Sequence, residues 1–489
     1  MINTISLSRS KPKKQGVSPQ KILNFIEAIE EKELELHSFM FLRHGNVISE
    51  GWWEPYKPNL KHTLFSLSKS FTSAAIGYAI EDGLITVEDT IISFFPNDIS
   101  KKIDNNLSTM KIKHLLTMST GHENDLTGKI YSAKDGNWVK AFFESPVENV
   151  PGTKFVYNSA ATYMLSAIIQ KVTSQTLLSY LESKLFNQLG ILATWETCPN
   201  GINTGGWGLN ITTEDIAKFG QLYLQKGMWN NKRILSEEWI NTSTAVHIAN
   251  GNDEDSDWSQ GYGYQFWRCR HNIYRGDGAF GQFCIVIPDQ DAVIAITSAT
   301  NDMQSVLNCV WEYLLPAFDD LSNYADESIQ ETLEHKLTSL SLSDALKKHN
   351  SSPISKQVSN KHYEFEKNEY NIKTLWINFR EDISTFTIVD NKYKHQLDCG
   401  IGKWLESKTT LLSYESEDST QHLNKSLTAA IGNWKDPCTF ILSIRFIETL
   451  FCYTIIFKFN DDNLMIEPSV NVSFGENNLP VIKGRVGKL

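Results

Sequence analysis

The sequence has no excess of positive charge. Lys and Arg together number 46, against 57 Asp and Glu, and the formal net charge is −11. Phosphate backbones repel a chain of this charge, so nucleic acid is not expected as a partner. A basic cluster does occur at positions 8–14, near the N-terminus, where a charge run predicts a solvated tail.

Cysteines with metal-binding or disulfide spacing are also lacking. The seven cysteines are an odd number, irregularly spaced and without a CxxC pair, which indicates buried free thiols in a reducing compartment. His122, Glu123 and Asp125 bunch potential ligands without zinc spacing, so they predict a solvated loop. We therefore expect no metal and no cofactor.

Long apolar runs are missing as well. The first 30 residues have no apolar core of the signal-peptide type. The most apolar stretch, 440–459, is interrupted by Arg445 and Glu448, and its β-branched and aromatic residues favour strands. These patterns predict a soluble, cytoplasmic protein without a membrane span.

What the sequence does contain is enough apolar material for two folded domains. It has 489 residues, of which 41% are hydrophobic. A polar, Ser-rich stretch separates two regions of different pattern. We predict one domain over 1–318, a linker over 319–360 and a second domain over 361–489.

The first region has strand patterns at both ends and helical patterns between them. If the two ends meet in one sheet, the fold class is α+β: an antiparallel sheet flanked by helices, with an inserted helical subdomain. The expected strands are 38–42, 47–52, 271–275, 283–288 and 292–298, with an aromatic strand at 261–267. The expected helices include 66–82, 160–172, 213–226 and 307–318.

The second region has strand patterns only. The clearest are 374–379, 384–389, 440–447, 450–457 and 464–468. This count suits a smaller all-β domain, either a barrel or a sandwich.

The residues that point to chemistry begin with Ser66 and Lys69, at the start of a very apolar helix. Residues three apart share a helix face, so the hydroxyl and the amine can hydrogen-bond. A lysine whose pKa is lowered by burial can activate a serine, and a helix N-terminus stabilises negative charge on a substrate oxygen. This pair predicts a nucleophile and its base.

The surrounding sequence resembles a known group of enzymes. The segments 65–73 (FSLSKSFTS), 81–85 (EDGLI) and 115–122 (LLTMSTGH) are similar to the superfamily of class C β-lactamases and penicillin-binding-protein-like esterases. That superfamily also includes D-aminopeptidases and nylon-oligomer hydrolases. The resemblance covers about residues 20–318 and implies the β-lactamase-like fold.

A second segment, 151–159 (PGTKFVYNS), resembles the family motif in which a tyrosine assists proton transfer. By this resemblance Tyr157 relays a proton to the leaving group and then activates water. A nearby cation can lower the pKa of a phenol, and we expect this of Tyr157. The family often has Asn where this chain has Ser159, a residue expected to bind Lys69 or the substrate.

A third segment, 275–283, aligns with the family strand that carries K-T-G or H-x-G. Gly276 occupies the Lys or His position, so β-lactam hydrolysis is expected to be weak at best. Gly278 is retained, and the N–H of Ala279 is expected to form an oxyanion hole with that of Ser66. Gly276, Gly278 and Trp207 are predicted to bind substrate, although Trp207 suits core packing equally well.

Together these features predict a serine hydrolase that acts on an amide or ester through a Ser66 acyl-enzyme. The expected substrate is a small ester, amide or peptide. The alternative is a catalytically inactive relative that uses the pocket for ligand binding or sensing, which Gly276 and Ser159 motivate. The substrate, the role of the C-terminal domain and the oligomeric state are left open by the sequence.

Overall fold

The computed structural model describes residues 6–99, 103–318, 327–342, 351–411 and 425–487. Contacts divide the chain into two compact units. Unit 1 comprises Met1–Gly51, Lys61–Ser298 and Asp302–Thr338; unit 2 comprises Trp52–Leu60, Ala299–Asn301 and Ser339–Leu489. The domains predicted from the sequence are consecutive segments of the chain, and their boundaries remain a prediction. Parts of the linker predicted at 319–360 lie outside the described residues.

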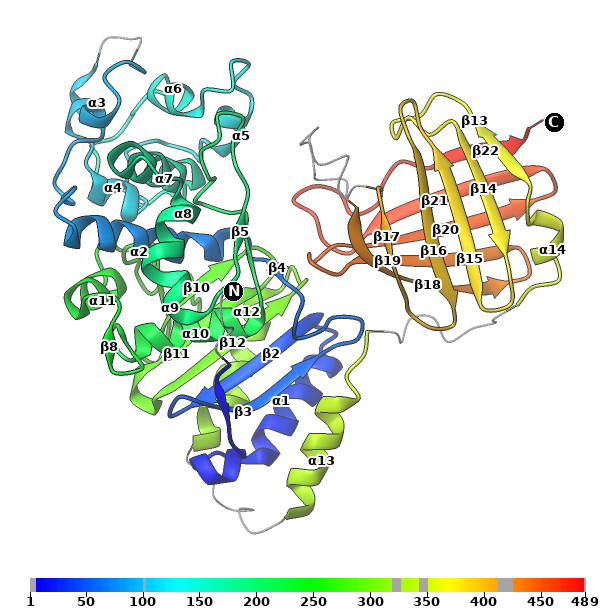
Figure 1. Ribbon diagram of the computed structural model, residues 1–489, viewed down its shortest axis with the longest axis horizontal. Coiled ribbons are helices and arrows are strands. Elements are labelled where there is room, and N and C mark those ends of the chain that lie inside the picture. The colour runs from blue at the N-terminus through cyan, green and yellow to red at the C-terminus, as the bar shows by residue number, and fades with distance from the viewer. Residues whose placement is uncertain (1–5, 100–102, 319–326, 343–350, 412–424, 488–489) are drawn as a thin grey trace. The chain divides into compact units, whose positions relative to one another are not determined.

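Unit 1 is built on a seven-stranded sheet in the order β1-β3-β2-β12-β11-β10-β9 (Figure 1). All neighbouring pairs whose register is known are antiparallel except β1 and β3, which run parallel. The strands are β1 (Ser8–Arg9), β2 (Leu36–Arg43), β3 (Asn46–Trp52), β9 (Trp267–Arg268), β10 (Tyr274–Gly278), β11 (Gln282–Ile287) and β12 (Ala292–Ser298). The α+β class and the meeting of early and late strands are confirmed.

Helices pack on this sheet. α10 (Thr213–Leu224) lies against β2, β11 and β12, while α1 (Pro19–Glu31) packs with α13 (Glu327–Thr338). The N-terminus of α10 is fixed by a capping box, in which the side chains of Thr212 and Asp215 each accept from the other's backbone N–H. Strands β2, β11 and β12 are almost entirely buried, as expected of a sheet covered by helices.

The inserted helices form a separate lobe of unit 1 (Figure 1). They are α3 (Asn105–Thr109), α4 (Ile112–Leu116), α5 (Thr127–Tyr131), α6 (Trp138–Phe143), α7 (Ser159–Thr173) and α8 (Leu177–Leu181), whereas the short α9 (Asn187–Leu189) lies near α10. The long helix α2 (Ser68–Glu81) packs against α7 and α8, and so joins this lobe to the sheet. α11 (Glu237–Thr244) precedes the last strands.

Several sequence predictions were wrong in detail. The basic cluster is not a free tail, because β1 pairs with β3 and Arg9 bridges Glu50 and Glu214 at 3.0 and 2.9 Å. The strand expected at 271–275 begins only at Tyr274, and the aromatic stretch 261–267 contributes only Trp267 to a strand. The closing helix over 307–318 is divided into α12 (Met303–Cys309), a π-helical turn and a 3₁₀ turn.

Unit 2 is a β-barrel (Figure 1). Its ten-stranded sheet has the order β16-β15-β14-β13-β22-β21-β20-β19-β18-β17 in the described residues, and a parallel contact of β16 with β18 closes the ring. The strands are β13 (His362–Phe365), β14 (Thr374–Phe379), β15 (Ile383–Val389), β16 (Lys394–Ile401), β17 (Leu405–Thr409), β18 (Ser426–Asp436), β19 (Thr439–Phe446), β20 (Cys452–Asn460), β21 (Asn463–Val470) and β22 (Ile482–Val486). Of the two predicted architectures, the barrel is observed.

An early segment of the chain belongs to this second unit. Trp52–Leu60 precedes α2 in sequence but groups with the barrel. Tyr56 packs in an apolar cluster with Ala429 and Ile447, and Lys57 forms an ion pair with Glu406.

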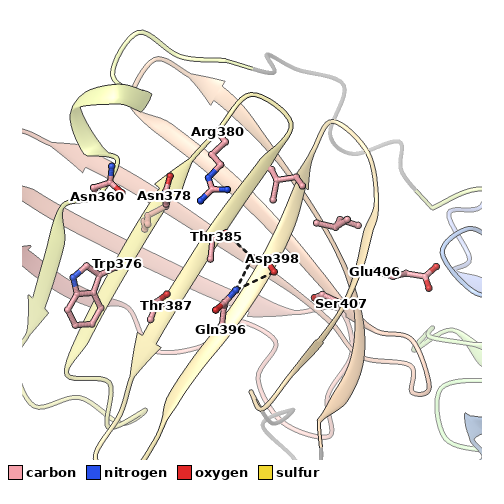
Figure 2. A pocket seen from close by; sticks show the side chains of 13 residues that line it. Asn360, Trp376, Asn378, Arg380, Thr385, Thr387, Gln396, Asp398, Glu406 and Ser407 are labelled. Carbon is pink, nitrogen blue, oxygen red and sulfur yellow. Dashed lines mark hydrogen bonds between the residues drawn. The ribbon is translucent and has the colours of Figure 1, made fainter.

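The outer face of β14, β15 and β16 is polar and forms a shallow concavity of about 700 Å³ (Figure 2). Asp398 accepts hydrogen bonds from Thr385 and Gln396 there, and the ring of Trp376 stacks on His362 with centroids 5.1 Å apart. Because side chains alternate along a strand, the opposite face of these strands forms the apolar interior of the barrel.

All seven cysteines are free; Cys438 is exposed and the other six are buried. None of the helices in the described ranges is long and apolar enough to cross a membrane.

Candidate active site

The candidate nucleophile lies where a short strand turns into a helix. β4 (His62–Thr63) pairs with β6 (Leu209–Ile211), which also pairs with β5 (Thr194–Trp195). A single 3₁₀ turn, Phe65–Leu67, then carries Ser66 into α2. Phe65 has a φ of 47°, a left-handed conformation that is uncommon for a bulky residue and is often found at functional sites.

Lys69 lies in the first turn of α2 with only 1% of its surface exposed. Its amine donates to Ser66 Oγ at 2.9 Å, to Ser159 Oγ at 3.0 Å and to the carbonyl oxygen of Gly206 at 2.8 Å. The structure therefore brings the predicted nucleophile, the predicted base and Ser159 together. Three hydrogen bonds fix the amine beside the hydroxyl.

Burial sets the protonation of this lysine. Loss of hydration lowers the pKa of Lys69 to about 7, while the negative charges of Asp125 and Asp277 oppose the shift. Near neutral pH a substantial fraction of the amine is consequently neutral, and a neutral amine can accept a proton.

The aromatic ring of Tyr157 lies beside the amine of Lys69. Lys69 Nζ is 4.9 Å from the centre of the Tyr157 ring, which stacks on Trp267 at 5.4 Å. The expectation of a lowered pKa is wrong: burial raises the pKa of Tyr157 well above its usual value, and a hydrogen bond with Ser66 only partly opposes this. Tyr157 therefore remains a neutral phenol that can donate a proton.

Ser159 is held at the N-terminus of α7. Its backbone N–H donates to Asp125 Oδ1 at 3.0 Å, and the side chain of the preceding Asn158 caps the helix through Ala160. From the sequence, Asp125 was expected to lie in a solvated loop. Its carboxylate is exposed, but it contacts the residue that holds Lys69 and acts on the charge of that lysine.

The strand β10 lies along the 3₁₀ turn that carries Ser66. A Cβ added to Gly276 would lie 2.5 Å from Ser70 Oγ and 2.6 Å from Leu67 Cδ1. A Cβ on Gly278 would overlap the carbonyl oxygen of Leu64. Both glycines therefore allow the strand to approach the turn that carries Ser66 closely, and Ala279 follows directly after this contact. Their predicted roles toward substrate stay predictions.

The other face of β10 carries two charged residues for which the sequence predicted no role. Arg275 and Asp277 form a buried ion pair of 2.8 Å, and the guanidinium lies 4.5 Å from the centre of the Trp258 ring. Burial raises the pKa of Asp277, while Arg275 opposes the shift. Arg275 and Asp277 are two positions apart in the segment that resembles the family strand, and this spacing was the available signal, because residues two apart on a strand share a face.

Trp207 belongs to an aromatic group. It follows Gly206, and its ring stacks on Tyr131 at 5.5 Å and lies 6.0 Å from Trp138. Its indole N–H is buried without a hydrogen-bond partner in the described structure. The residue is half-buried, as both of its predicted roles, pocket lining and packing, would allow.

The His122 region is not simply a solvated loop. His122 is buried, hydrogen-bonds with Thr120 at 2.9 Å and packs edge-on against Phe142. Glu123, by contrast, is exposed and pairs with Lys154. Within the described ranges, no three His, Cys, Asp or Glu side chains cluster closely enough to hold a metal ion.

An antiparallel sheet with an inserted helical lobe, and a serine and lysine one helical turn apart beside that sheet, define a protein of the β-lactamase-like class. The family model described as Beta-lactamase matches residues 32–312, more than half of the chain. The chain belongs to this family.

Curated relatives are distant. A 6-aminohexanoate-dimer hydrolase from Paenarthrobacter ureafaciens is 24% identical over 294 residues, which are 54% of this chain and 73% of the relative. A putative D-alanyl-D-alanine carboxypeptidase from Escherichia coli K12 is 26% identical over 163 residues, which are 31% of this chain and only 37% of that protein.

Solved structures confirm the fold. A putative 6-aminohexanoate-dimer hydrolase from Bacillus anthracis superposes with a TM-score of 0.55 at 21% identity, over 65% of this chain and 89% of that one. An octameric penicillin-binding protein homologue from Pyrococcus abyssi has a TM-score of 0.50 at 15% identity and covers 95% of this chain and 99% of its own. The second similarity extends over both units of the chain.

Proposed function

We propose that this chain is a serine hydrolase that cleaves a carboxylic amide or ester through an acyl-enzyme on Ser66. The observation that carries the proposal is the 2.9 Å contact between Lys69 Nζ and Ser66 Oγ. It is supported by the pKa of about 7 that burial gives the amine. Relatives named as hydrolases of the same family lend further support.

In the acylation step, Ser66 Oγ bonds to the substrate carbonyl carbon while neutral Lys69 takes the hydroxyl proton. The carbonyl oxygen becomes negatively charged and is stabilised by the backbone N–H groups of Ser66 and Ala279. When the tetrahedral intermediate collapses, Tyr157 gives its proton to the leaving amine or alcohol and regains one from protonated Lys69.

Water then releases the acyl group. The raised pKa of Tyr157 makes its phenolate a rare species, so the base for this step is Lys69 rather than the tyrosine expected from the sequence. Lys69 takes a proton from water as the hydroxide bonds to the acyl carbon, and it returns the proton to Ser66 as the ester breaks.

The proposed substrate class is an open-chain amide, ester or peptide. β-Lactam hydrolysis is expected to be weak, because Gly276 supplies no cation for a penicillin carboxylate and its contact with α2 leaves no space for a side chain. Hydrolysis rates for a panel of p-nitrophenyl esters, linear amides, D-alanyl-D-alanine peptides and β-lactams test whether open-chain substrates are preferred over β-lactams.

The decisive experiment is labelling by a fluorophosphonate followed by mass spectrometry. The wild type is expected to gain one adduct on Ser66, and Ser66→Ala none. Ser73→Ala is the matched control, because Ser73 lies on the same helix, is buried and makes no hydrogen bond through its hydroxyl in the described structure. An unlabelled wild type that also turns over no substrate would overturn the proposal in favour of a pocket used only for binding.

A further inference from the structure

The barrel of unit 2 contains an apolar cavity of about 190 Å³ that is partly open to solvent. Its lining is apolar and comes from many strands of the ring, including Leu375 of β14, Phe386 of β15, Leu397 of β16 and Phe457 of β20. These four side chains are at most 3% exposed. The cavity therefore reaches into the hydrophobic core of the barrel and is distinct from the concavity on its outer face (Figure 2).

An apolar cavity of this size that reaches into a protein core is unusual. Cores are packed as densely as organic crystals and contain few voids larger than a water molecule. Water would need two or more polar partners to be stable inside. Apolar cavities of roughly 150 Å³ stay dry and bind benzene, so this one has room for a substituted ring.

The geometry of the barrel accounts for the cavity. About eight strands give an interior that side chains can just fill, and more strands widen it. On β20 the inward positions Tyr453, Ile455 and Phe457 line the cavity, while the alternate residue Ile456 does not. The lining is thus set by strand alternation on a rigid sheet.

The side chains that line the cavity differ in how deeply they are buried. Ile372, Ile388 and Ile455 line the cavity yet are only half-buried, whereas Leu375 and Leu397 are almost completely buried. The half-buried apolar side chains mark the part of the wall nearest to solvent, and the partly open cavity gives a molecule from solution a route to the buried part.

The chemistry of the wall selects the ligand. No charged side chain is among the described residues that line the cavity, and the hydroxyl of Tyr370 already donates to the carbonyl oxygen of Pro480 at 3.0 Å. A buried carboxylate or ammonium would have no oppositely charged partner there. We propose that the barrel binds a compact neutral hydrocarbon group, a substituted benzene ring or an alkyl chain of similar volume, in this cavity.

The test is isothermal titration calorimetry of the full chain with n-propylbenzene and with 3-phenylpropanoate, which adds a carboxylate to a similar skeleton. One molecule of n-propylbenzene should bind per chain with a negative heat-capacity change, and 3-phenylpropanoate should bind at least ~tenfold more weakly. No saturable binding of n-propylbenzene, or equal affinity for the two, would overturn the proposal.

A matched pair of substitutions locates the site. Ile455→Trp places a larger ring in the cavity and should weaken n-propylbenzene binding at least ~tenfold, whereas Ile456→Trp, one residue along on the opposite face, should change it less than ~twofold. Equal effects of the two substitutions would show that n-propylbenzene binds elsewhere and would refute binding in the cavity.

A third variant keeps the test decisive if Ile455→Trp does not fold. Ile455→Ala enlarges the cavity and should shift the affinity ratio at least ~threefold toward n-pentylbenzene over n-propylbenzene. An unchanged ratio in a folded Ile455→Ala protein would contradict the proposal. None of these variants concerns Ser66, so the outcome is independent of the proposed hydrolase activity.

Discussion

The carboxylate of Asp125 accepts a 3.0 Å hydrogen bond from the backbone N–H of Ser159, the first residue of α7. The hydroxyl of Ser159 in turn contacts the amine of Lys69 at 3.0 Å. An exposed loop residue thereby influences the proposed base in two ways, by position and by charge. The two can be separated by experiment.

The kcat/KM of the wild type should depend on pH through the protonation of Lys69. Lys69 acts as a base only when neutral, and burial lowers its pKa to about 7. We expect kcat/KM for a neutral ester to be low in acid and to rise as pH passes through about 7, because the amine then loses its proton. Initial rates from pH 5 to 9 measure this limb; an acid limb near the ordinary lysine pKa would contradict the assignment.

Asp125→Asn isolates the charge. Asparagine keeps an oxygen that can accept from the N–H of Ser159 but removes the negative charge that favours protonated Lys69. The acid limb should therefore move to lower pH. Asp125 is exposed and its field is screened, so we expect a shift of roughly 0.2–0.5 pH units that shrinks in ~1 M salt. A shift of the acid limb to higher pH would contradict the direction that we expect from the loss of the negative charge.

Tyr157→Phe tests the proton donor. The variant keeps the ring stacked on Trp267 but loses the hydroxyl. Cleavage of an amide should fall by about 10²–10⁴-fold, because an amine leaves only after protonation. A p-nitrophenyl ester releases a stable anion and should lose much less. Parallel assays of the two substrates provide the control, and equal losses would argue against Tyr157 as the donor.

Features that depend on residues close together in the chain could be predicted from the sequence. The hairpin of β2 and β3, the apolar helix after Ser66 and the Ser66–Lys69 spacing all follow from residues close together in the chain. The roles of Asp125 and Asp277 depend on partners brought near by tertiary folding, so single-sequence patterns did not reveal them.

The same distinction applies to the C-terminal unit and to Tyr157. Strand patterns could not separate a barrel from a sandwich, because closure depends on the contact of Gly400 and Ile401 with β18. The pKa of Tyr157 was predicted in the wrong direction because its burial, which outweighs the hydrogen bond with Ser66, is a property of the folded state.

Gly276→Ala tests the close approach of β10 to α2. The added methyl group would meet Ser70 Oγ and Leu67 Cδ1, and we expect a loss of about 1–3 kcal/mol in the free energy of unfolding. Gly128→Ala is the matched control: it lies in α5, has open space around its Cβ and should be neutral or stabilising by up to ~1 kcal/mol. Urea unfolding measures both, and equal stabilities would show that the strand can move away at little cost.

His62 should make the folded protein sensitive to acid. Its Nδ1 lies 2.9 Å from the carbonyl oxygen of Thr63 and must carry the hydrogen, so Nε2 accepts from His37 at 3.0 Å. Burial, reinforced by His37, lowers the pKa of His62 to about 3. Between that value and about 6.5, the value of an unperturbed histidine, the unfolded chain binds a proton that the folded one does not.

The free energy of unfolding should therefore fall as pH decreases from about 6.5, and the loss should continue toward pH 3. His62→Gln keeps an acceptor for His37 but cannot titrate, so its unfolding free energy should fall less steeply between pH 7 and pH 5. His335→Gln, at an exposed position of α13, should retain the wild-type slope. Urea unfolding at several pH values measures the three slopes, and a His62→Gln slope equal to that of the wild type would assign the acid sensitivity to other groups.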